Sequence, residues 1–533
     1  MDPSTQKTQQ HDVERAVGIL GLCFILGLAV YFRFANLRAN PGWYSDEGVF
    51  INYAENLMNG RWQIFALSGS PMLIQRSPLF LFLLAGMFKL WGADILVLRG
   101  LAAFYGVMSV LLLYIFARET FGTRLALLSA GVLAICPWVV AYNRIGFTYN
   151  QMSPLFIVAV YSCWKFAEKK STSWAITACP VAGLAFATDY LGVVASLLVG
   201  VVFLVYDRRW LLPGALLVGA VLATVLAPAF LASPRGFWGD VSFTFAARTS
   251  VSPLFQIINV VLNYGELIRR ESWIVLGIVG LFLLPQGRAK SLILFVVGVT
   301  VLLAVRTLPP VGRGLHYLLH VFPLVVLGIA AFIARAVPVI LDTLESAFDG
   351  LASRLWLSGK NAVFDRFWQM GQRVAVSVIL FGVLVSPLLW MVFADVAQSV
   401  YGNYFIFTGN DDLSLSAEED VNQVIDFLRS HTTADDLVVA SPQIAWAVPS
   451  RKADFPLALA YDGKNAGAQP DLPHSRFAYS CSLQQSAYVI LDPLARDFAT
   501  KVLPDMSALI EQVERWQLVF RAGDLEVYKN PLG

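Results

Sequence analysis

The residues best suited to chemistry are two adjacent acids, Asp46 and Glu47, in the segment from Asn40 to Leu57. They follow the first long apolar run and precede an amphipathic helical pattern over Val49–Leu57. The simplest interpretation of an isolated acidic pair here is the start of a helix, because Ser45 can cap it and the helix dipole favours early carboxylates. A carboxylate held at a membrane face can also act as a general base.

Three further polar groups belong to segments that the distribution of basic residues places on the same side of a membrane as the acidic pair. These groups are Gln75 with Arg76, Tyr142 with Asn143 and Arg144, and Arg306 with Arg313, His316 and Tyr317. An arginine can bind a phosphate through two parallel hydrogen bonds. Each arginine taken alone is more simply a residue that reaches the lipid headgroups, so the inference depends on the whole set.

A carboxylate base, several cations and aromatic side chains at one membrane face suit the transfer of a sugar from a polyprenyl phosphate to a hydroxyl or amine. The carrier phosphate lies at headgroup level, where arginines can stabilise the charge that develops as it leaves. Phosphate is a good leaving group, so one base that deprotonates the acceptor is sufficient. A single displacement without a covalent intermediate predicts inversion at the anomeric carbon.

Long apolar runs must position these residues. The chain has 533 residues, of which 57% are hydrophobic and 14% charged, whereas soluble chains carry roughly a quarter charged residues. A helix that crosses a bilayer needs about 20 apolar residues. We therefore expect an α-helical polytopic membrane protein with about 11 spans, near 16–36, 96–117, 123–142, 151–168, 173–188, 190–206, 211–232, 272–286, 291–307, 316–336 and 374–395.

The short stretch Ser77–Trp91 decides the topology. Lysine and arginine concentrate in cytoplasmic loops. If this stretch does not cross and the N-terminus is cytoplasmic, every basic cluster falls inside; the clusters are at 118–124, 165–170, 208–209, 288–290 and 335–373. We therefore predict an interfacial or re-entrant segment at 77–91. The outer side then receives 37–95, 143–150, 233–271, 308–315 and the C-terminal region.

The composition after about residue 400 is that of a soluble domain. We expect a transmembrane domain over 1–398, with its first outer loop at 37–95, and an extracytoplasmic α/β domain over 399–533. A capping box at Ser416–Glu419 predicts a helix to Ser430, and a second helix is expected near Asp505–Trp516. Short strands are expected at 437–440, 488–491, 518–521 and 525–529. We expect this domain to cover the site or to select the acceptor.

Other classes of function find little support in the sequence. The five cysteines give no disulfide framework and the five histidines no metal-ligand spacing. A net charge of +2 does not indicate a nucleic-acid partner. The polar N-terminus leads into an apolar run without a clear cleavage site, which we interpret as an uncleaved first span.

Several motifs resemble those of the C-type membrane glycosyltransferases, the superfamily of protein O-mannosyltransferases and lipid A aminoarabinose transferases. The similarity covers about residues 15–340 and depends on Tyr44-Ser-Asp-Glu-Gly48, Arg76-Ser-Pro-Leu-Phe80, Arg118-Glu-Thr-Phe-Gly-Thr-Arg124, Tyr142-Asn-Arg144 and His316-Tyr-Leu-Leu-His-Val-Phe-Pro323. The resemblance implies a polyprenyl-phosphate sugar as donor and a lipid, glycan or protein as acceptor. It requires no cofactor, although the acidic pair is compatible with a divalent metal ion.

The resemblance also implies roles for individual residues. Asp46 matches the catalytic acid and Glu47 its companion, whereas Tyr317 matches a tyrosine near the lipid phosphate. Arg76 stands where the family often has lysine or histidine before Pro-Pro-Leu, and one proline is missing here. The expected donor-binding set is Arg76, Tyr142, Arg144, Arg313, His316 and Tyr317.

The chain departs from the family pattern after Arg144. Some members carry an acid two or three residues later, whereas this chain continues Ile145-Gly-Phe-Thr-Tyr-Asn150. Asp189 is a candidate substitute, although a role as a helix cap is the simpler interpretation.

Two alternatives to the enzyme stay open. One is a transporter or flippase of lipid-linked saccharides, which would need polar or broken helices at the bilayer midplane. The other is a non-catalytic binder of the lipid carrier. For the enzyme, we expect a multi-pass protein of a bacterial inner membrane, with a cytoplasmic N-terminus and its site on the opposite face.

Overall fold

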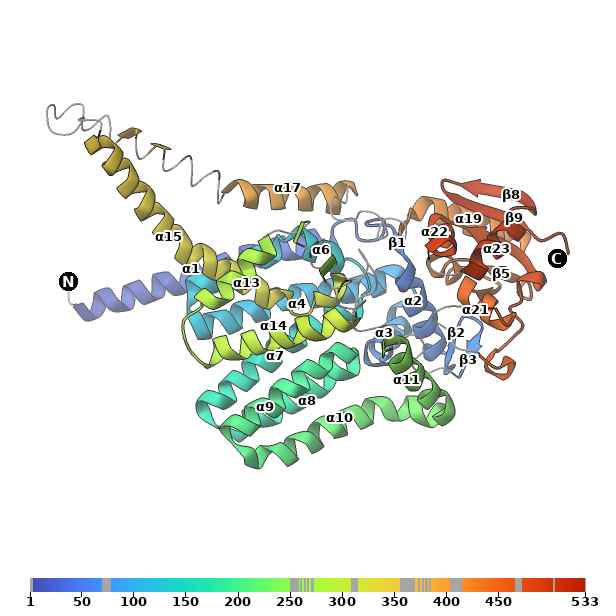
Figure 1. The fold of residues 1–533 in the computed structure, drawn as a ribbon, viewed down its shortest axis with the longest axis horizontal. Coiled ribbons are helices and arrows are strands. Elements are labelled where there is room, and N and C mark those ends of the chain that lie inside the picture. Colours follow the sequence, from blue (N-terminus) through green and yellow to red (C-terminus); the bar gives the residue numbers. More distant parts are fainter. Residues whose placement is uncertain are drawn as a thin grey trace.

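The computed structural model describes residues 3–69, 78–249, 273–307, 315–354, 386–402, 415–464, 472–501 and 504–532, with scattered positions at 258–269 and 370–385. The described chain is mostly helical. Figure 1 shows a helical bundle with the N-terminus at one end and a body of strands and short helices at the other. Arg76 and Arg313 lie outside the described residues.

Apolar runs form the bundle helices. In chain order they are α1 (Pro3–Phe34), α4 (Ile95–Phe121), α5 (Thr123–Ala134), α6 (Pro137–Asn143), α7 (Thr148–Lys169), α8 (Thr172–Thr188), α9 (Val193–Tyr206), α10 (Leu211–Ala232), α13 (Trp273–Leu283), α14 (Arg288–Thr307), α15 (Phe322–Arg354) and α17 (Ser386–Tyr401). Each predicted span up to residue 336 contains a helix. The predicted span 374–395 is described with gaps before residue 385, and α17 includes its end.

The span predicted at 123–142 is bent. Its two helices, α5 and α6, meet at Cys136-Pro137 with an angle of 61°, because proline cannot continue the hydrogen-bonding of the preceding helix. Among the described residues, three helices are long and apolar enough to cross a membrane: Ala16–Phe34, Ile95–Phe121 and Arg208–Ala232. The bent pair would be a fourth, and several apolar helices are shorter. The number of spans therefore stays a prediction.

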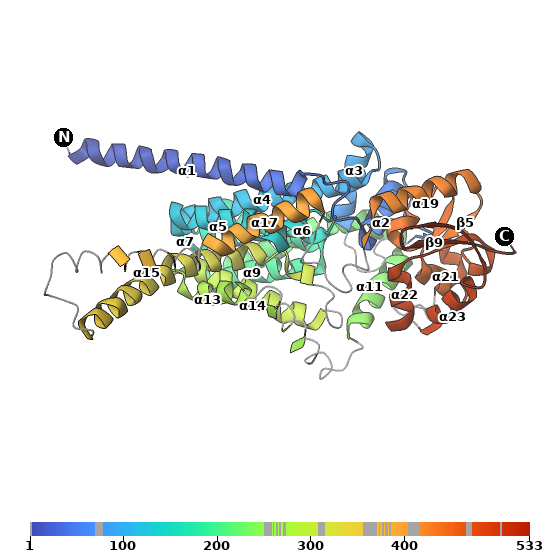
Figure 2. The same ribbon diagram turned by 90° about the horizontal axis from the view of Figure 1, so that it is seen from above.

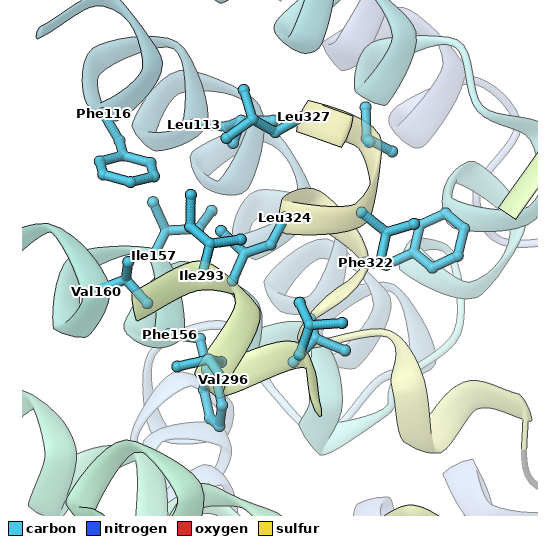
Figure 3. Close-up of a cluster of buried hydrophobic side chains, with 14 of the residues drawn as sticks. Leu113, Phe116, Phe156, Ile157, Val160, Ile293, Val296, Phe322, Leu324 and Leu327 are labelled. Carbon is cyan, nitrogen blue, oxygen red and sulfur yellow. The ribbon is translucent and has the colours of Figure 1, made fainter. Parts of the chain in front are cut away.

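Branched and aromatic side chains fill the bundle core. Figure 3 shows part of it, in which Phe116 of α4, Phe156 of α7, Ile293 of α14 and Leu324 of α15 point toward one another. All four side chains are buried. Between α13 and α15 the backbones come very close, since a Cβ added at Gly280 would lie 1.8 Å from the carbonyl oxygen of Gly328. Small residues at helix contacts are typical of membrane bundles.

The C-terminal body is built on a five-stranded sheet with the strand order β6-β5-β7-β9-β8. Its strands are β5 (Leu437–Val439), β6 (Arg451–Ala453), β7 (Ser486–Leu491), β8 (Gln517–Ala522) and β9 (Leu525–Lys529). Strand β5 is parallel to both β6 and β7, whereas β9 is antiparallel to β7 and β8. The helices α19 (Glu418–His431), α20 (Pro442–Ala445), α21 (Phe455–Tyr461), α22 (Pro493–Lys501) and α23 (Pro504–Val513) connect the strands.

The predicted strands and both predicted helices of this region are present, with one wrong cap and one missed strand of the five-stranded sheet. Helix α19 has Ala417 as its N-cap, without a side-chain cap bond. Ser416 instead belongs to strand β4 (Leu415–Ser416), which pairs with β1 (Trp43–Tyr44) of the first loop. The missed strand is β6, whose three residues form no recognisable apolar pattern.

The first loop packs onto the C-terminal sheet. This loop contains β1, α2 (Ser45–Met58), β2 (Gln63–Ile64), β3 (Leu67–Ser68) and α3 (Pro78–Trp91). Phe50 and Phe80 from the loop share one hydrophobic core with Val438 and Leu491 from the sheet. Residues 78–91 of this stretch thus form a helix that packs against α2, and whether the stretch crosses a membrane stays a prediction.

Loops predicted to share one side of the membrane contact one another. At the end of the bundle away from the sheet, Lys165 pairs with Glu119, and Arg288 lies 3.7 Å from Glu168. At the other end α1 meets α17, where the Ser399 hydroxyl donates to the Phe32 carbonyl at 2.8 Å. Figure 2 shows α1 along one edge of the bundle and the C-terminal sheet at the end far from the N-terminus.

Candidate active site

Helix α2 carries the acidic pair in its first turn. Its N-cap is Tyr44, so the expected cap at Ser45 is wrong by one residue. The Glu47 carboxylate accepts a hydrogen bond from the Tyr44 backbone N–H at 3.0 Å. This hydrogen bond caps the first turn of α2. Asp46 lies on the same turn.

Glu47 forms a buried ion pair with Arg99 of α4. The Nε and Nη2 atoms of Arg99 lie 2.8 Å and 2.7 Å from the two carboxylate oxygens, and both side chains are at most 1% exposed. The backbone N–H of Gly146 adds a third contact to this carboxylate at 3.0 Å. Glu47 thus joins α2 to α4 and to the turn before α7, and its oxygens are fully occupied.

Arg99 also holds the loop that precedes the acidic pair. It donates to the carbonyls of Leu37 at 3.0 Å and Arg38 at 2.9 Å, and to that of Gly42. Arg99 is not among the predicted site residues, because it lies at the start of a predicted span and has the sequence context of a headgroup-facing residue. An arginine at one end of a span together with a carboxylate in the adjoining loop is the signal that could have identified the pair.

Asp46 differs from its neighbour in exposure. Glu47 is buried, whereas Asp46 is only partly buried. The ion pair of Glu47 fixes the backbone of the turn that carries Asp46. The arrangement therefore has one buried, anchored acid beside one partly exposed acid.

Arg144 is buried among backbone carbonyls. Its side chain is fully buried and its guanidinium donates to backbone carbonyls of the α1 end and of α17, namely Phe32, Ala35, Asn36, Asn40 and Ser399. Four of these five carbonyls lie near one guanidinium nitrogen, Nη2. Arg144 thus ties three chain segments together beside the acidic loop, and its role in binding the donor stays a prediction.

The predicted residues Tyr142, His316 and Tyr317 lie in one aromatic cluster. His316 stacks on Phe147 with a centroid distance of 4.5 Å and lies 4.6 Å from Tyr317 and 6.1 Å from Tyr142. Tyr44 contacts Phe147 from the other side at 5.1 Å. The cluster therefore adjoins the N-cap of the helix that carries Asp46.

The remaining predicted residues differ in outcome. Arg76 and Arg313 lie outside the described residues, so their placement stays a prediction. Asp189 accepts a hydrogen bond from the Leu191 N–H at 3.2 Å and begins a short 3-10 helix, as the simpler interpretation expected. No group of three metal-binding side chains occurs among the residues that the structure describes.

Contacts from the C-terminal region reach this end of the bundle. Arg476 lies 3.5 Å from the buried carboxylate of Asp240 on α11 (Pro234–Thr249), and its Nε donates to the carbonyl of Ser68 at 3.4 Å. The segments predicted as outer loops therefore converge around the first loop.

Comparisons with known proteins show which proteins this chain resembles. The family model for dolichyl-phosphate-mannose-protein mannosyltransferases matches residues 75–232. The structure is similar to that of ArnT from Cupriavidus metallidurans bound to undecaprenyl phosphate, with a TM-score of 0.56, 13% identity and coverage of 96% of this chain and 97% of that one. The chain shares the fold of the C-type (GT-C) glycosyltransferases and, over residues 75–232, resembles one of their families in sequence. No curated protein sequence matches it significantly.

A second GT-C structure shares the arrangement over most of this chain. The archaeal oligosaccharyltransferase AglB from Archaeoglobus fulgidus, in complex with an inhibitory peptide and a dolichol-phosphate, has a TM-score of 0.53 and 12% identity. The match covers 89% of this chain and 69% of that one. At such identities the likeness establishes the GT-C fold of a membrane protein, and the substrates follow from other arguments.

Proposed function

We propose that this GT-C protein transfers a sugar from a polyprenyl-phosphate donor to an acceptor, with inversion and with Asp46 as the general base. The observation that carries the proposal is the accessible Asp46 beside a Glu47 that is immobilised by Arg99 and Gly146. A base must be held in place to act at one atom of its substrate. The anchored Glu47 supplies that rigidity, so its role is to orient the turn.

The class of donor is inferred from the GT-C neighbours and the aromatic cluster. One neighbour is bound to undecaprenyl phosphate and another to a dolichol-phosphate. The tyrosines and histidine at 142, 316 and 317 lie at the bundle end near the acidic loop, where side chains that are both aromatic and polar suit the headgroup region. We assign the carrier phosphate to this end, with Arg76 and Arg313 as its predicted cationic partners.

The reaction needs one proton transfer. The acceptor oxygen or nitrogen attacks the anomeric carbon while its proton passes to the Asp46 carboxylate. The bond between that carbon and the phosphate oxygen breaks, and the electron pair leaves with the polyprenyl phosphate. Attack from the face opposite the leaving group gives inversion, and no metal or other cofactor is needed for the balance.

We propose the orientation of the protein in the membrane from the charged residues at the two ends of the helical bundle. Ion pairs between predicted cytoplasmic loops involve Lys165 and Arg288, and they lie at the end of the bundle away from the acidic loop. Since basic loops stay in the cytoplasm, the acidic loop and the sheet would face the outside of a bacterial inner membrane. About 11 spans and a boundary near residue 398 complete the proposed topology.

The test measures the release of polyprenyl phosphate from labelled polyprenyl-phosphate sugars in proteoliposomes with crude acceptor extract. We expect Asp46→Asn to slow release at least about 100-fold, a loss of about 2.7 kcal/mol of transition-state stabilisation. Glu55→Gln, an acid on the same helix, is the matched control and should stay within about threefold of wild type.

Two other results would contradict the proposal. If Asp46→Asn and Glu55→Gln release carrier equally fast, Asp46 is not the base. If no protein releases carrier from any donor but the lipid moves between the leaflets, the transporter alternative replaces the enzyme.

A further inference from the structure

The carboxyl edge of the C-terminal sheet lies against the acidic loop. Strand β5 has β6 on one side and β7 on the other, both parallel to it. After β5 the chain forms β6 on one side of β5 and then β7 on the other side. The connections that follow β5 and β7 therefore run in opposite directions along the sheet. In open α/β sheets, such a switch point at the carboxyl ends is the usual place of a ligand-binding crevice.

Here the crevice is closed by side chains of the chain itself. Ser441, two residues after β5, donates to Asp492, directly after β7, at 2.9 Å. Gln443 of α20 donates to the other oxygen of Asp492 at 2.8 Å. All three side chains are at most 2% exposed. This network fixes α20 over the switch point.

Helix α2 occupies the position above α20, where a ligand would otherwise lie. A Cβ added at Gly48 would fall 1.9 Å from the carbonyl oxygen of Pro442, which means that the two backbones are in direct contact. Gly48 is two residues from Asp46 and one from Glu47. Any larger residue must push the first turn of α2 away from the sheet.

The strand before α2 is held by the same domain. Trp43 pairs with Ser416 in the β1–β4 ladder, and the ring of Trp43 lies 5.1 Å from that of Trp446. Gly42 has a φ of +105° and its Cβ position would be 2.9 Å from the Ser416 carbonyl. The C-terminal region therefore contacts the acidic turn on both sides, through β1 and through Gly48.

We propose that the switch-point edge of the C-terminal sheet is a docking site for the acidic loop, and that Gly48 and Gln443 are positioning residues for Asp46. The inference rests on the proposed function for its catalytic part. It assigns the sheet a part in setting the place of the base, beyond covering the site or selecting the acceptor. Displacement of a catalytic group by about 1 Å can cost about 100-fold in rate.

The test compares Gly48→Ala with Gly86→Ala in the full-length protein. Gly86 is a helical glycine on α3 with open space around its Cβ position. For Gly48→Ala we expect faster hydrogen exchange over residues 43–58 and a kcat that falls about 10- to 100-fold. The Kd for undecaprenyl phosphate should stay within about threefold, because the proposed carrier site lies on other elements. Gly86→Ala should match the wild type in all three measurements.

Gln443→Ala provides an independent variant, because it removes the hydrogen bonds of Gln443 to Asp492 and to Ser416 without a substitution in α2. It should also speed exchange over residues 43–58 and lower kcat. If Gly48→Ala also speeds hydrogen exchange in α7, that variant has lost the whole fold. The exchange over residues 43–58 and the kcat of Gln443→Ala then test the inference.

The inference is overturned if exchange over residues 43–58 equals that of wild type in both variants, or if exchange rises while kcat does not fall. A wild type that releases carrier from no donor would defeat the proposed function, and the exchange measurement would still decide whether the sheet holds the loop.

Discussion

At the scale of single residues, the two adjacent acids have different surroundings and therefore different proposed roles. The Glu47 carboxylate receives hydrogen bonds from Arg99, Tyr44 and Gly146, so it has no capacity for a substrate. A buried ion pair of this kind contributes less to net stability than to specificity of position, because desolvation offsets much of the attraction. Breaking it by removal of one partner is costly, since the other charge stays buried.

The first prediction concerns this ion pair. Glu47→Gln should lower the free energy of unfolding by about 3–5 kcal/mol, because the buried Arg99 charge loses its counter-ion. Arg38→Ala, which breaks a solvent-exposed pair with Asp94, should cost at most about 1 kcal/mol. Thermal unfolding of both variants in the same detergent measures the difference. Equal effects of the two substitutions would contradict the role of the Glu47–Arg99 pair.

A second prediction separates the two roles considered for Arg144. Arg144→Lys should lower the unfolding temperature, because one ammonium group cannot reach the spread of carbonyls that the guanidinium contacts. The Kd of the folded protein for undecaprenyl phosphate should stay within about threefold. Tyr317→Phe is the comparison at a residue that we retain near the donor. A Kd for undecaprenyl phosphate raised more than about tenfold in Arg144→Lys, with the unfolding temperature unchanged, would show that Arg144 binds the phosphate.

At the scale of elements, the sequence predicted those features that local patterns determine. Apolar runs indicated the helices, since each run must hide its backbone from lipid. The ladder between Trp43 and Ser416 could not be predicted, because its partners are 373 positions apart along the chain. The same holds for Arg99 and Gly146 around Glu47. Ser416 was assigned to a helix cap because a local motif matched, and a long-range strand pairing displaced it.

The third prediction concerns the pH dependence of the C-terminal sheet. Burial raises the pKa of the Asp492 carboxyl to about 6. A raised pKa means that the folded state binds the proton more tightly than the unfolded state. Stability from this group is therefore present below about pH 4 and is lost as the pH rises through about 6, by up to about 3 kcal/mol.

Asp492→Asn should remove this pH dependence. The variant should therefore gain stability relative to wild type between pH 4 and pH 7. Gln443 can rotate its amide to accept from the new Asn, since its Oε1 has no hydrogen-bond partner in the described part of the chain. Unfolding temperatures from pH 4 to pH 8 measure the effect, with Asp435→Asn, whose side chain is 87% exposed, as the control. Parallel curves for wild type and Asp492→Asn would contradict it.

At the scale of the whole molecule, the two ends of the bundle have different chemistry. One end gathers the basic loops, in which Lys165 and Arg288 pair with acids of neighbouring segments. The other gathers the acidic turn, the aromatic cluster and the sheet. A lipid-linked donor requires this separation, because its phosphate stays in one headgroup layer while its sugar must meet the acceptor outside the bilayer. Orientation in the membrane is therefore part of the mechanism.

The last prediction tests that orientation with two single-cysteine variants, Ser475→Cys and Lys169→Cys. Both positions are exposed, and they lie at opposite ends in the proposed topology. In intact bacterial cells, a membrane-impermeant maleimide should label Ser475→Cys and leave Lys169→Cys unlabelled until the membrane is permeabilised. Cys23 is the exposed natural cysteine among the described residues, so it is replaced by serine in both variants. The reverse labelling pattern would place the acidic turn in the cytoplasm, where the positive-inside argument and the proposed site of sugar transfer would both fail.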